Sequence, residues 1–174
     1  VSIARKSDII ENRIIPDLAI VGLASSGRST YEQTENSGIG SNGLTSARHD
    51  MLSHYYAETY PESYDSSLPK NLTYCGPYKL DHALPGSEQT VGQALLSPTR
   101  SYAPVILELL NLMKHEINAI VHCSGGAQTK CLRFGEGIHF VKNNLMTVPA
   151  VFNAIQTASG TTMKEMYKVF NMGH

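Results

Sequence analysis

Hydrophobic positions along this chain follow two patterns, short continuous runs and longer stretches with helical spacing. Continuous apolar runs at 18–23, 117–121 and 138–141 predict strands, the first of them buried. A shorter strand is expected near 72–74. The longest apolar runs span about six residues, too few to cross a membrane.

Helical spacing of apolar residues predicts helices over much of the remaining chain. They are expected at 44–58, at 101–116, at 126–134, after Pro149, and in a last segment after Thr161 or Thr162 that includes Met166, Tyr167 and Phe170. Ser41 or Asn42 can cap the first of these helices. Residues 24–41 are rich in Ser, Gly, Thr and Asn and predict a long loop, and the proline-containing stretch 60–92 predicts irregular structure.

Strands interleaved with helices, without a regular alternation, predict an α+β fold in which helices cover a mixed β-sheet. The length of 174 residues suits one domain, spanning 1–174. The chain begins at Val1 without a methionine and stops directly after an apolar helical pattern. We therefore expect a piece of a longer protein that lacks an N-terminal domain and one or more final strands. Removal of that domain should expose an apolar face, so we expect self-association.

Composition and charge exclude several classes of protein. The formal net charge is −1, so neither a nucleic acid nor an anionic membrane is expected as a partner. Hydrophobic residues make up 41% of the chain and charged residues 17%, which excludes a disordered protein. The cysteines are Cys75, Cys123 and Cys131, an odd number without framework spacing. Reduced thiols in a cytoplasmic protein are therefore expected.

Small polar residues precede glycines at two places, one in the long loop and one at the start of the first helix. Ser25-Ser26-Gly27 and Ser41-Asn42-Gly43 would let the backbone approach a phosphate and would offer neutral donors to it. A flexible loop and a helix cap are the alternative interpretation. The spacing fits neither a P-loop nor a dinucleotide-binding fingerprint.

A third segment, 96–100, combines a proline with a threonine and an arginine. Thr99 can cap the helix that follows, and Arg100 lies near the start of that helix. The guanidinium of Arg100 can contact a phosphate or form a structural salt bridge, and the sequence does not distinguish the two. Asn171 stands between an apolar helix end and a glycine, where asparagine commonly caps a helix.

The stretch from His122 to Gly126 places an imidazole between an apolar run and a glycine pair. Unpaired N–H groups in such a turn suit a phosphate or a developing negative charge, and a neighbouring imidazole can move protons near neutral pH. A structural core histidine is the alternative. A metal site is disfavoured because its spacing matches no metal-binding motif. That site would comprise His122, Cys123, Cys131 and His139.

Together these segments resemble the C-terminal half of phosphoribosylformylglycinamidine cyclo-ligase, also called AIR synthetase. The family pattern is GLxSSG, SNGxS, LLxPTRxY, a His-x-x-Gly-Gly-Gly turn and EMYxxFNMG, in that order. The matching segments are Gly22-Leu23-Ala24-Ser25-Ser26-Gly27, Ser41-Asn42-Gly43, Leu95-Leu96-Ser97-Pro98-Thr99-Arg100-Ser101-Tyr102, His122-Cys123-Ser124-Gly125-Gly126 and Glu165-Met166-Tyr167-Lys168-Val169-Phe170-Asn171-Met172-Gly173. They cover nearly the whole chain.

The resemblance implies the fold of that C-terminal domain and an ATP-dependent ring closure in purine biosynthesis. Formylglycinamidine ribonucleotide would be converted to aminoimidazole ribonucleotide, with ATP and Mg²⁺ held mostly by the missing N-terminal domain of a homodimeric enzyme. His122 is the implied catalytic residue. The implied substrate- and phosphate-binding residues are Ser25, Ser26, Gly27, Ser41, Asn42, Gly43, Thr99, Arg100, Ser124, Gly125, Gly126 and Asn171. No metal ligand is assigned.

Three departures from the family pattern leave other functions open. Ile39-Gly40 replaces the usual Pro-His, residues 28–40 resemble an insertion, and Ala127 replaces the third glycine of the turn. One alternative is a sister enzyme of the same ATP-dependent superfamily, such as thiamine-monophosphate kinase, selenophosphate synthetase or formylglycinamidine synthetase. Another is a non-catalytic module that binds a phosphorylated metabolite.

Overall fold

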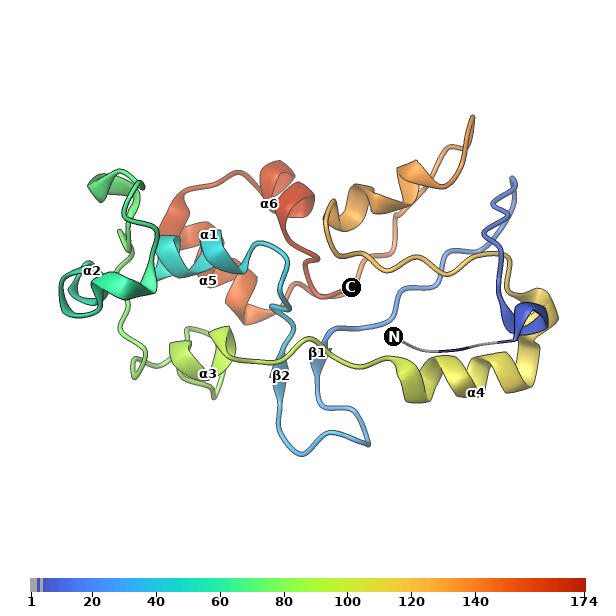
Figure 1. The fold of residues 1–174 in the computed structure, drawn as a ribbon, viewed down its shortest axis with the longest axis horizontal. Helices are drawn as coiled ribbons and strands as arrows, with labels where there is room; N and C mark the ends of the chain where they lie inside the picture. Colours follow the sequence, from blue (N-terminus) through green and yellow to red (C-terminus); the bar gives the residue numbers. More distant parts are fainter. Residues whose placement is uncertain (1–2, 4) are drawn as a thin grey trace.

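The structure, a computed structural model, describes residue 3 and residues 5–174. Its α-helices are α1 (Leu44–Met51), α2 (Tyr55–Thr59), α3 (Val91–Leu95), α4 (Ala103–Met113), α5 (Ala150–Ser159) and α6 (Met163–Val169). Its 3₁₀ helices are η1 (Lys6–Asp8), η2 (Pro61–Ser63), η3 (Lys70–Leu72), η4 (Lys114–Glu116) and η5 (Ala127–Arg133). The strands β1 (Ser26–Gly27) and β2 (Asn36–Ser37) lie near the middle, with α2 and α4 toward opposite ends (Figure 1).

The two last helices confirm the prediction from the sequence. Pro149 immediately precedes α5, and Gly160 ends it in a left-handed conformation with φ +67°. Thr162 caps α6, because its side-chain oxygen accepts the N–H of Glu165 at 3.3 Å. The expected helix at 101–116 is also present, as α4 followed by η4.

The expected single helix at 44–58 is wrong, because α1 ends at Met51 and α2 begins only at Tyr55. Leu52 takes an extended conformation, and Ser53 donates its N–H to the carbonyl of Tyr78 at 2.8 Å. This contact directs the chain away from the helix. The cap also differs, since Gly43, with φ +77°, occupies the N-cap position and no side chain caps α1.

Helix α3 lies in the stretch that the sequence predicted to be irregular. Thr90 accepts the N–H of Gln93 at 3.2 Å, and the Gln93 side chain accepts the N–H of Thr90 at 2.8 Å. This reciprocal pair is a capping box, which stabilises the first turn of a short helix.

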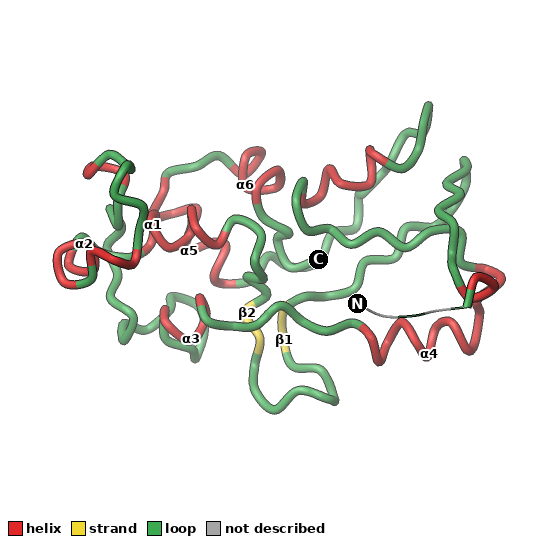
Figure 2. The backbone as a smooth tube through the Cα atoms, viewed as in Figure 1, coloured by secondary structure: helices red, strands yellow, loops and turns green. Residues whose placement is uncertain are grey.

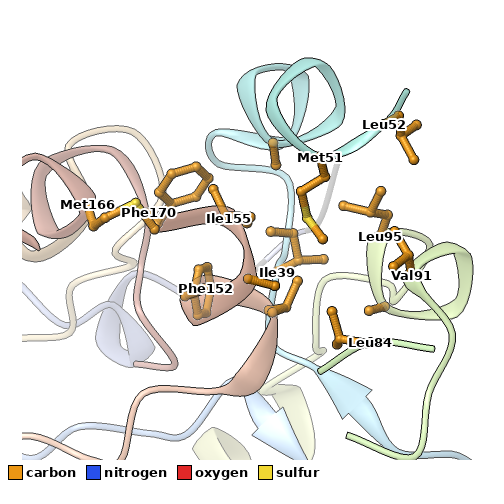
Figure 3. Packing of buried hydrophobic residues seen from close by; sticks show 14 of the residues in the cluster. Ile39, Met51, Leu52, Leu84, Val91, Leu95, Phe152, Ile155, Met166 and Phe170 are labelled. Carbon is orange, nitrogen blue, oxygen red and sulfur yellow. The ribbon is translucent and has the colours of Figure 1, made fainter. Parts of the chain in front are cut away.

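The hydrophobic core lies between α1, α3, α5 and α6, as Figure 3 shows. Ile39, from the loop after β2, is fully buried and lies near Met51 of α1 and the helix α5 (Figure 3). Phe152 of α5 is fully buried and its ring lies 5.8 Å from that of Phe170, just after α6. The core therefore fixes the loop after β2 and the end of α6 against the same helix.

The mixed sheet expected from the sequence is not formed among residue 3 and residues 5–174. β1 and β2 pair antiparallel, with Ser26 opposite Ser37, whereas 18–23, 117–121 and 138–141 run as irregular chain (Figure 2). The predicted strand near 72–74 is also absent, since η3 ends at Leu72.

The expected sheet does not form because the apolar runs are not paired through a continuous series of backbone hydrogen bonds. Arg13 donates its N–H to Asn118 at 2.8 Å, and Asn12 accepts the N–H of Ile120 at 3.0 Å. These contacts bring 12–13 beside 118–120 without a continuous series of backbone pairs. Val21 is 80% exposed, so the first run is not buried as expected. Helices together with a small antiparallel sheet are compatible with an α+β fold.

Helix α4 lies outside the core. None of its residues is buried, and Leu107 and Leu112 are 62% and 75% exposed. An apolar helix with so much exposed surface commonly marks a site of association. No helix within the described part of the chain has the length and apolar character needed to span a bilayer.

Candidate functional site

Several chain segments that the sequence singled out are joined to one another in the structure. The N–H of Ser25 donates to the carbonyl of Gly173 at 2.9 Å, which joins the first loop to the turn after α6. The buried Ser25 hydroxyl donates to the carbonyl of Gly38 at 3.2 Å. This residue therefore holds both sides of the loop that contains β1 and β2.

Strand β2 fixes the segment before Arg100 in the same place. Asn36 donates its amide to the carbonyl of Pro98 at 2.9 Å. The N–H of Ser37 donates to the Ser97 hydroxyl at 3.1 Å, and the Ser37 hydroxyl donates to the carbonyl of Ala94 at 2.7 Å. Asn36 and Ser37 are both buried, so each of these polar groups is satisfied away from water.

The Ser41-Asn42-Gly43 turn packs against the end of α6. The Asn42 amide donates to the carbonyl of Val169, and the Ser41 carbonyl accepts the N–H of Leu44 at 3.4 Å. A Cβ added at Gly43 would lie 2.5 Å from the Phe170 ring, and the φ of +77° there disfavours any other residue. This glycine is required by both its conformation and its close contact with α6.

Asn171 organises the turn that follows α6. Its side-chain oxygen accepts the N–H of Gly173 at 3.1 Å, and its carbonyl accepts the Gln128 amide at 2.9 Å. Lys142 donates to the carbonyl and to the side-chain oxygen of Gln128 at 2.6 and 2.9 Å. Because Gln128 belongs to η5, these bonds connect the 122–126 turn to the other segments.

The predicted helical segment at 126–134 is confirmed as the 3₁₀ helix η5. The turn before it is tight, because Ser124 donates its N–H to the carbonyl of His122 at 2.9 Å. Gly126 and Ala127 have φ of +99° and +44°. A left-handed conformation disfavours alanine, so Ala127 is strained at the position where the family pattern has a glycine. His122 itself is exposed, which excludes a buried core histidine.

Cys123 lies half-buried beside His122. Burial raises the pKa of its thiol, and the positive charges of Lys142 and Lys130 lower the pKa by smaller amounts. The thiol form is therefore favoured over the thiolate. Within residue 3 and residues 5–174, no three His, Cys, Asp or Glu side chains lie close enough to share a metal ion.

Arg100 is buried against the loop that contains β1. Its Nε and Nη2 donate to the two carboxylate oxygens of Glu32 at 2.8 and 2.6 Å. Nη1 donates to the carbonyls of Ala24 and Ser26 at 2.7 and 3.0 Å, and Nη2 also donates to Gly27 at 2.6 Å. The structure thus shows the salt bridge that the sequence left open as one of two roles.

The ion pair changes the protonation equilibrium of both partners. The pKa of Glu32 is lowered, first by its hydrogen bond to Arg100 and then by the N–H of Ser29, which donates to it at 2.9 Å. The pKa of Arg100 is raised chiefly by the same bond to Glu32. Both groups therefore stay charged at neutral pH, and the loop is held by a charge-assisted contact.

Thr99 does not cap α4, contrary to the prediction from the sequence. The N-cap of α4 is Tyr102, which makes no side-chain capping bond, and the helix begins at Ala103. Thr99 is instead exposed, and its hydroxyl oxygen lies 3.9 Å from the place that a Cβ at Gly40 would occupy.

The predicted site residues differ in exposure. Ser41, Thr99, His122 and Gly125 are exposed; Ser26, Gly27, Asn42, Gly43, Ser124, Gly126 and Asn171 are half-buried; Ser25 and Arg100 are buried. Sequence reasoning missed Glu32, Gln128 and Lys142, which hold these segments together. No local signal identifies them, because each acts on a residue brought close only by folding.

Several curated cyclo-ligases are similar to this chain over most of its length. A phosphoribosylformylglycinamidine cyclo-ligase from Methanococcus vannielii is 29% identical over 99% of the chain and 40% of its own length. Those from Methanopyrus kandleri and Pseudothermotoga lettingae are 32% and 30% identical over 91% and 89% of the chain, and 35% and 36% of their own lengths. No protein-family model matches the chain.

The similarity extends over the segments that converge in the structure, since it covers nearly the whole chain. These matches confirm the resemblance to phosphoribosylformylglycinamidine cyclo-ligases that the motifs of the chain predicted. The chain spans about two-fifths or less of the length of the curated relatives that it matches, 35–40% in four of them.

Proposed function

We propose that this chain is the C-terminal, substrate-side part of a cytoplasmic cyclo-ligase that acts as a homodimer. The complete enzyme would close the imidazole ring of aminoimidazole ribonucleotide from formylglycinamidine ribonucleotide in purine biosynthesis. The activity named for the relatives supports this reaction. The substrate would be a phosphorylated nucleotide, bound between this chain and an N-terminal domain.

The convergence of the 25–27, 41–43, 97–100 and 171–173 segments is the observation that carries the proposal. The bond from Ser25 to Gly173 and the bond from Asn42 to Val169 tie distant parts of the sequence to one turn. Glycines and small polar side chains gathered in this way let a ligand approach the backbone closely. Backbone N–H groups suit the phosphate of a nucleotide substrate.

The exposure of each predicted site residue indicates whether it contacts the ligand or positions the loops. We assign ligand contact to the exposed Ser41, Thr99 and Gly125, with half-buried neighbours completing the surface. Ser25 and Arg100 are buried and fully engaged in internal bonds, so they would position the loops instead. A phosphate could reach the Arg100 guanidinium only by displacing Glu32.

His122 is the proposed catalytic residue. Its side chain is exposed beside the tight 122–126 turn, where it can meet a substrate. A histidine in this position can accept the proton that the attacking amine loses, or donate a proton to the leaving oxygen. Its role rests on the family resemblance together with this exposure.

ATP would activate the formamide oxygen as a phosphoryl leaving group, with Mg²⁺ neutralising its charge. Within the described residues, no group of three His, Cys, Asp or Glu side chains offers a ready metal site. The sequence also contains no P-loop. Following the family resemblance, we assign most of the contacts of ATP and Mg²⁺ to the rest of the enzyme.

The test is turnover of formylglycinamidine ribonucleotide with Mg-ATP by the intact polypeptide that contains this chain. We expect His122→Ala to lower turnover about 10²-fold or more with folding intact. The matched control is His115→Ala, since His115 is equally exposed but lies on η4. This control should retain activity.

Each other outcome has a distinct meaning. If His122→Ala retains turnover, the family reaction stands and His122 is not catalytic. If the wild type makes no product, the cyclo-ligase reaction is wrong. A sister enzyme or a non-catalytic module that binds a phosphorylated metabolite would then explain the site, and a melting comparison with and without ligand would separate the two.

A further inference from the structure

A hollow lined by tyrosines lies around α2, among residues that the proposed active site does not use. Its volume is about 610 Å³, within the range of small-molecule sites. We call it the tyrosine hollow and define it by Tyr55, Tyr56, Tyr60, Tyr74, Arg48 and Lys79. It lies at the α2 end of the molecule, away from β1 and β2 (Figure 1).

The rings of the tyrosine hollow are held in a fixed arrangement. Tyr56 lies edge-on to Tyr55 at 5.2 Å and parallel to Tyr60 at 6.3 Å, measured between ring centroids. Its hydroxyl accepts the N–H of Leu80 at 2.8 Å. Tyr55 and Tyr60 are nonetheless 46% and 47% exposed. No cation lies over the Tyr60 ring among the described residues, so this ring is available to a planar ligand without rearrangement.

The charges around these rings favour an anion. The Lys79 ammonium lies 4.6 Å from the centre of the Tyr55 ring, and the Arg48 guanidinium lies 5.9 Å from that of Tyr74. Arg48 is positioned by the carbonyl of Ser63, which accepts its Nη2 at 2.9 Å. Within the described residues, neither Lys79 nor Arg48 forms a salt bridge.

A cationic ligand is disfavoured by the same contacts. Aromatic cages bind cations through free ring faces, but Lys79 and Arg48 already lie over two of the rings. Asp81 is the carboxylate in the lining, against these two positive charges. The net positive charge and the exposed aromatic faces suit one ligand that is both planar and negatively charged.

We propose that the tyrosine hollow binds a planar aromatic anion of nucleotide size. Its heterocycle stacks on Tyr60, and its phosphate or carboxylate lies between Lys79 and Arg48. This site goes beyond the cyclo-ligase reaction and does not depend on it. Direct binding is the readout, so failure of one proposal leaves the other intact.

The test is isothermal titration calorimetry of this chain with AMP, adenosine and inorganic phosphate as separate probes. AMP should bind more tightly than either adenosine or phosphate, because only AMP offers both the ring and the charge. Tyrosine emission gives a second readout. The chain has nine tyrosines and no tryptophan, so stacking on the Tyr60 ring should quench its fluorescence.

Variants separate the ring contact from the charge contact. Tyr60→Leu and Lys79→Gln should each weaken AMP binding about tenfold or more. Tyr60→Phe retains the ring and should bind AMP as the wild type does. Lys164→Gln, an exposed lysine on α6, is the matched control for charge and should change nothing.

Two results would overturn the proposal. If phosphate binds as tightly as AMP and Tyr60→Leu has no effect, the hollow is an anion site without aromatic recognition. Absence of any heat and any quenching with millimolar AMP would exclude the site altogether. A thermal melt of each variant excludes unfolding as the cause, since Tyr60 and Lys79 are both exposed.

Discussion

Glu32 and Arg100 lie 68 residues apart in the sequence and form an ion pair through both carboxylate oxygens, at 2.8 and 2.6 Å. Glu32 belongs to the 28–40 stretch, which the sequence predicted to be an insertion relative to the family pattern. Arg100 belongs to the Pro-Thr-Arg motif of the family pattern. The 28–40 stretch therefore provides the ion-pair partner of a motif residue.

Loss of the Glu32 charge should loosen this loop. We expect Glu32→Gln to lower the free energy of unfolding by about 2 kcal/mol, because it removes two charge-assisted hydrogen bonds from a buried guanidinium. Urea denaturation measures the change. Lys168→Gln is the control, since it breaks the exposed pair with Glu165 and should cost less than about 0.5 kcal/mol. Equal effects of the two variants would contradict the structural role of Glu32.

Gly43 tests the packing of the Ser-Asn-Gly turn on α6. Gly43→Ala should destabilise the chain by more than about 2 kcal/mol, because a Cβ there lies 2.5 Å from the Phe170 ring. Gly137→Ala is a matched control, since Gly137 also has positive φ, +67°, but no neighbour within 4 Å of an added Cβ. That variant should cost only the conformational penalty of about 1 kcal/mol. If the two variants lose the same free energy of unfolding, the close contact at Gly43 does not contribute to stability.

Buried His49 should make stability depend on pH. Burial lowers the pKa of His49, with Arg48 adding to the effect, and its Nδ1 accepts the N–H of Tyr74 at 3.2 Å. The folded state therefore favours neutral imidazole. This stabilisation is complete above about pH 6.5, the usual value in an unfolded chain, and is lost as the pH falls through the lower folded pKa.

Thermal melts between pH 7.5 and 5.0 measure this dependence. His49→Gln should flatten the decline at low pH, because glutamine can accept the N–H of Tyr74 without titrating. His115→Gln, on exposed η4, should retain the wild-type slope. An unchanged slope in His49→Gln would show that another group titrates.

Helix α4 should cause this chain to associate with a second copy of itself. Leu107 and Leu112 are exposed on a helix with no buried residue, and apolar surface of this kind is commonly covered in solution. Analytical ultracentrifugation should show a mass that rises with concentration. Leu107→Glu with Leu112→Glu should shift the equilibrium toward monomer. A wild-type monomer at high concentration would refute the expectation.

Local patterns predicted the elements whose signals lie within a few residues. Pro149 and Thr162 mark the starts of α5 and α6, and both helices form where expected. The capping box of Thr90 and Gln93 is equally local and identifies α3, although the prolines around it led to a prediction of irregular structure. Element starts with an explicit chemical cap are therefore readable from sequence.

Long-range partners could not be predicted in this way. The apolar runs at 18–23, 117–121 and 138–141 have the composition of strands, but a strand also needs a paired neighbour. The motif segments were identified from the sequence, whereas their meeting at the bond from Ser25 to Gly173 became visible only in the folded chain. The same holds for Glu32, whose importance depends entirely on Arg100.

The uneven distribution of the core has a kinetic consequence. Met51, Phe152 and Met166 are fully buried on α1, α5 and α6, whereas α4 buries nothing. Backbone amides in α1 and α5 can exchange with deuterium only when the core opens, while those of α4 need only local fraying. The protein should therefore show two widely separated exchange rates, and a protease should cut within α4 long before it cuts within α1 or α5.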